Sequence, residues 1–93
     1  MRTHVSIRGF EPTEELRAEA EALAAALADE AHAELAKIAL EQRGDALTAG
    51  LILAVPGQAS VVRHASARDW PGALRELGLL VRAELEVRSA PAQ

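Results

Sequence analysis

The sequence has no cysteine and very few aromatic residues, with one Trp, one Phe and no Tyr among 93 residues. The absence of cysteine excludes disulfides, thiolate metal sites and a cysteine nucleophile. With an aromatic share of only 2%, the core must be filled by Ala, Leu, Val and Ile. Apolar residues make up 49% of the chain, which argues against disorder. We expect one domain over residues 1–93, with an ordered core from about 3 to 88.

Long hydrophobic runs are also missing. No stretch combines a basic region with a following apolar run, and no run approaches the roughly 18 apolar residues of a membrane span. We therefore expect a soluble, cytoplasmic protein that does not bind a membrane.

The chain has a small net negative charge of −4, which argues mildly against strong nucleic-acid binding. This charge is unevenly distributed. Residues 11–34 contain eight acids and one Arg, a balance of −7, whereas residues 60–93 contain five Arg and four acids, a balance of +1. A surface that attracts anions is therefore expected in the C-terminal half or on the first strand.

The N-terminal third reads as a strand followed by a helix. Residues 4–9 alternate between polar and apolar, with Val5 and Ile7 on one face, which predicts a half-buried strand. Thr13 is a suitable N-cap for the helix that follows. The apolar stripe of this helix consists of Leu16, Ala20, Leu23, Leu27 and Ala31.

The stretch from residue 33 to residue 44, "AELAKIALEQRG", is compatible with two structures. Local propensity favours helix, because Ala, Leu, Glu and Lys are all helix formers. A strand would instead place Ala36, Ile38 and Leu40 inward and the charged residues outward. A continuous helix of about thirty residues would be unusual in so small a domain. The residue pattern alone leaves both structures open.

The C-terminal half predicts two hairpins and a helix. Apolar strands are expected over 46–55 and 58–67, with turns at "RGDA" and at Pro56-Gly57, which together give an antiparallel meander. Asp69 is a suitable cap for the last helix, and Pro71 fits its first turn. The buried stripe of this helix consists of Trp70, Leu74, Leu77, Val81 and Leu85.

With residues 33–44 as a strand, the order is β-α-β-β-β-α. This order predicts an α+β two-layer sandwich, in which two helices pack on one face of a four-stranded sheet.

Several segments resemble the ribosome hibernation-promoting and ribosome-associated inhibitor family. "VSIRG" followed by "TEELR" is close to the family's first strand and its T-x-x-L-R helix start. "LAKIALE" falls where the family has an apolar strand ending in an acid, and "PGQASVVRHASARDWPGAL" resembles its glycine turn, last strand and final helix start. The resemblance covers residues 4–88 and implies a strand near 34–42. It also implies the two-layer fold of double-stranded-RNA-binding domains.

The resemblance further implies a non-catalytic protein without a cofactor. Such a protein docks on the small ribosomal subunit through 16S rRNA and inhibits translation in quiescent cells. The sequence keeps Arg17 of the family's basic helix positions. Several other such positions carry apolar residues that cannot neutralise a phosphate, namely Leu23, Ala26, Leu80, Ala83 and Val87. The alternative is therefore a protein-interaction or dimerisation module that keeps this fold but has lost rRNA binding.

The candidate phosphate contacts are all arginines: Arg8, Arg17, Arg63, Arg68, Arg75 and Arg82. We expect Arg68, Arg75 and Arg82 to form a basic stripe along the last helix, and Arg8 and Arg63 to extend the patch across the open sheet. The alternative interpretation is a solvated helix face whose arginines form ion pairs. Leu79 and Leu80 form an extra apolar flank on this helix, which indicates either an interface, such as that of a homodimer, or a wider core.

The remaining candidates give no catalytic or metal site. His4, His32 and His64 lack ligand spacing, and Ser66, His64 and Asp69 are only near one another in sequence. We therefore expect no enzyme activity, no metal and no small-molecule substrate, since no sheet pocket is evident. Trp70 is expected to anchor the last helix in the core, with base stacking as its alternative role.

Overall fold

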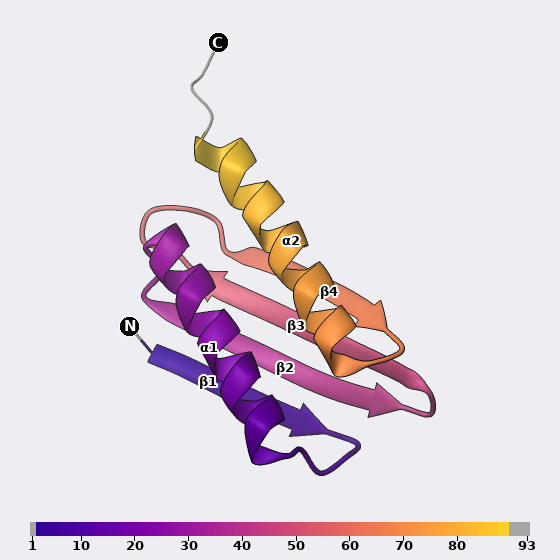
Figure 1. The fold of residues 1–93 in the computed structure, drawn as a ribbon. Coiled ribbons are helices and arrows are strands. Elements are labelled where there is room, and N and C mark those ends of the chain that lie inside the picture. Colours follow the sequence, from indigo (N-terminus) through magenta and orange to yellow (C-terminus); the bar gives the residue numbers. More distant parts are fainter. Residues whose placement is uncertain (1, 90–93) are drawn as a thin grey trace.

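Alternating residues form strands in four places, and two amphipathic segments form helices (Figure 1). The computed structural model describes residues 2–89. The elements are β1 (Arg2–Arg8), α1 (Glu14–Ala31), β2 (Leu35–Arg43), β3 (Ala46–Ala54), β4 (Val61–Ala67) and α2 (Trp70–Ser89).

The four strands form one sheet in the order β1-β2-β3-β4. β1 pairs parallel to β2, with α1 as the crossover between them, whereas β2, β3 and β4 pair antiparallel. The predicted meander of two hairpins and the predicted α+β fold are therefore confirmed.

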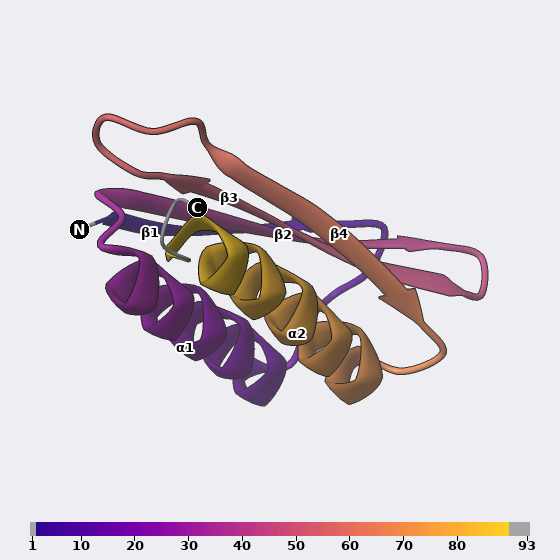
Figure 2. The same cartoon turned by 90° about the horizontal axis from the view of Figure 1, so that it is seen from above.

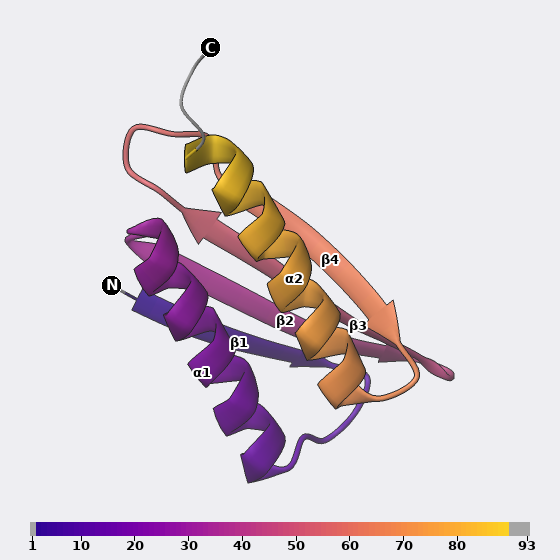
Figure 3. The same ribbon diagram turned by 45° about the horizontal axis from the view of Figure 1, so that its top comes forward.

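Both helices cover the same face of the sheet (Figure 2). α1 packs mainly over β1 and β2, and α2 over β3 and β4 (Figure 3). The core between the layers is aliphatic; its largest fully buried side chains are Leu27, Ile38, Leu40, Leu51, Leu53, Val61, Leu77 and Val81. The opposite face of the sheet has no covering element among residues 2–89 and is called the open face below.

The first helix ends at Ala31, and the helical alternative for the following residues is wrong. Its N-terminus is capped as predicted, because Thr13 Oγ1 accepts a hydrogen bond from the Leu16 N–H at 3.1 Å. At the other end, His32 adopts a left-handed conformation with φ of 56°. β2 then lies between β1 and β3 and pairs with both. This pairing, together with the complete burial of Ile38 and Leu40, outweighs the local helix propensity.

The last helix begins as predicted. Asp69 Oδ1 accepts a hydrogen bond from the Gly72 N–H at 2.6 Å, so Asp69 caps the helix. Trp70 stacks on Phe10 with a ring-centroid distance of 4.9 Å, and this contact joins the start of α2 to the loop before α1. The anchoring role of Trp70 is confirmed, although its side chain is only half-buried.

Several strand boundaries differ from the prediction, and β3 ends at Ala54 rather than at residue 55. β1 spans Arg2–Arg8 rather than 4–9, and β4 begins at Val61 rather than at residue 58. The pairing of β4 with β3 starts at Val61 and Leu53, so residues 58–60 lie in the loop between these strands. Within residues 2–89, neither helix is long and apolar enough to cross a membrane.

Candidate nucleic-acid interface

The six candidate arginines do not form one patch. Arg8 projects from the open face. Successive residues of a strand point to opposite faces, and in β1 Val5 and Ile7 are the residues that pack against the core. Arg17 and Arg75 are exposed on α1 and α2, on the other side of the sheet. Arg68 lies in the connection between β4 and α2. The structure thus distributes these cations over both layers.

The placement of Arg63 on the open sheet is wrong. Arg63 lies on the same face of β4 as the buried residues Val61 and Ala65, so it projects towards the helix layer. There it forms an ion pair with Glu84 of α2. Glu84 also pairs with Arg88 at 2.8 Å.

Arg88 completes this network by donating hydrogen bonds to the carbonyl oxygens of Ala59 and Ser60, at 2.6 and 3.2 Å. The network ties α2 to β4 and to the loop before it. Arg63 is therefore partly neutralised by a carboxylate and has a structural role. Sequence reasoning assigned no role to Arg88, because its acceptors are main-chain oxygens of a distant loop.

Arg82 is also paired. Its guanidinium donates to both carboxylate oxygens of Glu30 on α1, with distances of 3.1 to 3.3 Å. The hydrogen bond that Arg82 donates to Glu30 raises the pKa of Arg82 above its usual value. The pair links the two helices across the surface of their layer. It interrupts the predicted basic stripe of Arg68, Arg75 and Arg82, in line with the ion-paired alternative.

Four cations gather on the open face, of which only Arg8 was among the candidates. Arg2 and Arg8 project there from β1, and Lys37 and Arg43 from β2. The one carboxylate that the strands place on this face is Glu41, which pairs with Arg43 at 3.1 Å. Four cations against one carboxylate give the open face a positive balance in a chain of net charge −4. The alternation within β2 already indicated the outward position of Lys37, but the order of the strands did not follow from sequence.

The centre of the open face is hollowed. A cavity of about 380 Å³ lies over the small residues Ala39 and Gly50. Its rim includes His4, Ser6, Lys37, Ile52 and His64. This pocket was not expected from the sequence, which shows no sheet pocket.

Gly50 explains why the hollow has a histidine wall. A Cβ at position 50 would stand 2.7 Å from Cδ2 of His64 and 3.1 Å from its Nε2. The missing side chain therefore lets the imidazole lean inward over β3. His4 and His64 come from opposite edges of the sheet, yet both reach this hollow.

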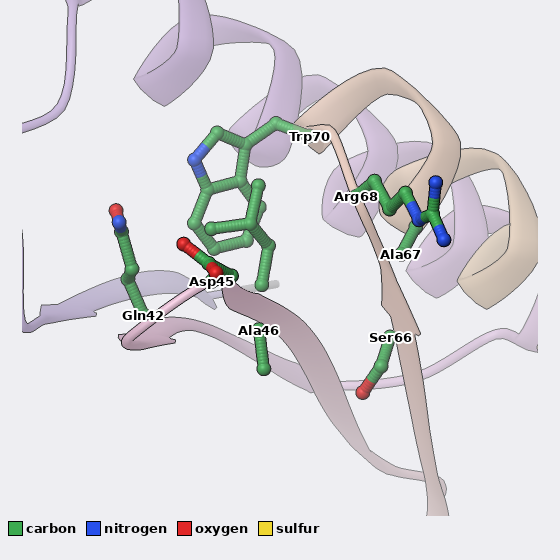
Figure 4. A pocket seen from close by; sticks show the side chains of 8 residues that line it. Gln42, Asp45, Ala46, Ser66, Ala67, Arg68 and Trp70 are labelled. Atoms are coloured by element: carbon green, nitrogen blue, oxygen red, sulfur yellow. The ribbon is translucent and has the colours of Figure 1, made fainter.

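A second, larger hollow of about 910 Å³ lies at the end of the sheet, where the β2–β3 turn meets the β4–α2 connection. In Figure 4, Asp45 and Gln42 lie on one side of it near Trp70, and the guanidinium of Arg68 points away from them. The nearby carboxylate of Asp45 makes this place less favourable for a phosphate. No cluster of His, Asp or Glu that could hold a metal ion occurs among residues 2–89.

The two candidate interface leucines have different surroundings. Leu80 is half-buried and packs against the core, as expected for a wider core. Leu79 is 58% exposed on α2. Of these two leucines, only Leu79 is therefore available for an intermolecular contact.

The comparisons with known proteins establish the fold. No family model matches the chain, and no curated protein matches it. Among solved structures, a ribosomal subunit interface protein from Coxiella burnetii aligns with a TM-score of 0.84 and 16% identity, over 98% of this chain and 100% of that one. The Protein Y N-terminal domain from Thermus thermophilus aligns with a TM-score of 0.76 and 21% identity, over 91% and 94%. This chain therefore has the fold of those two proteins, as the sequence resemblance implied.

Proposed function

We propose that this chain is a non-catalytic, cytoplasmic, ribosome-associated factor of the hibernation type. It docks on the small subunit through 16S rRNA and inhibits translation in quiescence. The observation that carries this proposal is the alignment of 98% of the chain with the whole of a ribosomal subunit interface protein.

The contacts proposed for the rRNA backbone are the arginines whose charge is available. Arg8, Arg17, Arg68 and Arg75 carry no ion pair within residues 2–89. Arg63 and Arg82 face the carboxylates of Glu84 and Glu30, so we assign them the weaker part of the binding. This division follows from electrostatics, because a paired cation releases fewer counterions from RNA.

Cosedimentation with purified 30S and 70S particles tests the proposal. We expect binding at about 50 mM salt and a loss on the order of 100-fold at about 200 mM, as for four phosphate contacts. Binding that is independent of salt would contradict the phosphate contacts. Absence from both particles at low salt would contradict the function itself.

The second candidate function is a homodimer or protein-interaction module, favoured by the exposure of Leu79. Val87, on the same helix, is 74% exposed. In sedimentation equilibrium, a dimer through this flank is expected to dissociate when Leu79 is changed to Glu. A wild-type chain that stays monomeric at high micromolar concentration would rule out the dimer.

A further inference from the structure

We propose that the hollow on the open face binds one unpaired nucleotide of single-stranded RNA, and that this face makes the main RNA contact. This inference rests on the proposed function and deepens it. It assigns the contact to the sheet, whereas the resemblance implies contacts through the helices.

The first argument is charge. Arg2, Arg8 and Lys37 project from the open face and carry no ion pair within the part of the chain that the structure describes. The helix layer bears most of the acids of residues 11–34, and its Arg82 is held by Glu30. A polyanion is therefore attracted to the open face and repelled by much of the helix layer.

The second argument is the shape of the hollow. Register places Ser6, Ala39, Gly50 and His64 in one row across the four strands. The neighbouring row is His4, Lys37, Ile52 and Val62. The two central residues of the first row are Ala39 and Gly50, so the floor of the hollow is low between higher walls. Its volume of about 380 Å³ lies in the lower part of the range of small-ligand sites.

The third argument is the chemistry of the walls. The imidazole of His64 and the exposed Ile52 offer a ring and an apolar surface to a base. Lys37 and His4 are paired neighbours at the other side and offer N–H donors to a phosphate. A nucleotide combines a planar base with a phosphate, so it fits both kinds of wall. Base recognition on an open sheet by stacking and flanking cations is a common mode of single-strand binding.

Binding of a fluorescently labelled uridine hexanucleotide to the purified 93-residue chain tests this inference. Lys37→Glu is expected to weaken the binding at least tenfold, measured by anisotropy at low salt. Removal of the ring in His64→Ala is expected to weaken it about tenfold. The control is Ala83→Glu, which adds a negative charge on the exposed surface of α2 at a position assigned no RNA contact, with an expected effect below about threefold.

Four results would overturn the inference. The first two are no binding by the wild-type chain at low salt and equal losses of affinity for Lys37→Glu and Ala83→Glu. The other two are an affinity for uridine monophosphate equal to that for the hexanucleotide, and an equal affinity for a hexaglutamate peptide that binds at the same residues. Amide chemical shifts provide an independent check. We expect the hexanucleotide to perturb Ala39, Gly50 and His64 and to leave α2 unchanged.

The two proposals fail separately. If Lys37→Glu cosediments with ribosomes as well as wild type does, the open face is not the contact, and the ribosomal function stands. If the wild type binds the hexanucleotide through Lys37 but never cosediments with ribosomes, the ribosomal function fails.

Discussion

Changing Leu77 to Ala is expected to lower the free energy of unfolding by about 2–5 kcal/mol. Leu77 lies on α2, is fully buried and belongs to the core between the helices and the sheet. Its truncation loses buried apolar area and leaves a cavity that a closely packed core fills only partly. A chain of 93 residues has a total stability of roughly 5–14 kcal/mol. The loss should lower the midpoint of thermal unfolding by about 10 °C or more.

Leu79 offers a matched control for this change, two residues further along the same helix. It is 58% exposed, so Leu79→Ala is expected to change the stability by no more than about 0.5 kcal/mol. Urea unfolding of dilute protein, followed by circular dichroism, measures both variants. Equal effects of the two substitutions would show that α2 does not pack on the sheet through the Leu77 face.

Changing Gly9 to Ala is expected to cost about 3 kcal/mol. Gly9 follows β1 with a φ of +84°, a left-handed conformation that costs an L-residue about 1–2 kcal/mol. A Cβ there would also lie far inside van der Waals contact with the carbonyl oxygen of Gln42. Because Gln42 belongs to β2, the clash can be relieved only by moving the ends of two paired strands.

Gly44 allows the conformational cost of a left-handed residue to be measured without the steric clash. It has a similar φ of +59°, but a Cβ there meets nothing within 4 Å. Gly44→Ala therefore carries only the conformational cost of about 1–2 kcal/mol. The difference between the two variants in chemical denaturation measures the steric contribution of Gln42. No difference between them would mean that the end of β1 is not held against β2.

Local signals were sufficient for much of the fold. Thr13 and Asp69 were identified as caps from residue type and position, and both accept the expected hydrogen bonds. The turn-forming residues Pro56 and Gly57 and the apolar segments on either side of them likewise predict the turn and its two strands. These features depend on interactions between residues a few positions apart, which a sequence displays directly.

The candidate site was much less predictable. The sequence indicated that Arg63 and His64 lie on opposite faces, which the structure confirms, but not which of the two faces the helices would cover. The sequence indicated Arg82 as a candidate contact, but it did not indicate that Arg82 pairs with Glu30, which lies 52 positions away. The hollow over Gly50 depends on four strands in one register, so no single segment carries its signal.

The sequence by itself therefore determined the order and type of most elements, the apolar stripes of the two helices, and the absence of thiol chemistry. The tertiary structure decided that residues 35–43 form a strand, because pairing on both sides outweighs helix propensity. It also decided which charges are available, because ion pairs form between elements that only folding brings together. The positive open face of a negatively charged chain is the result of this long-range arrangement.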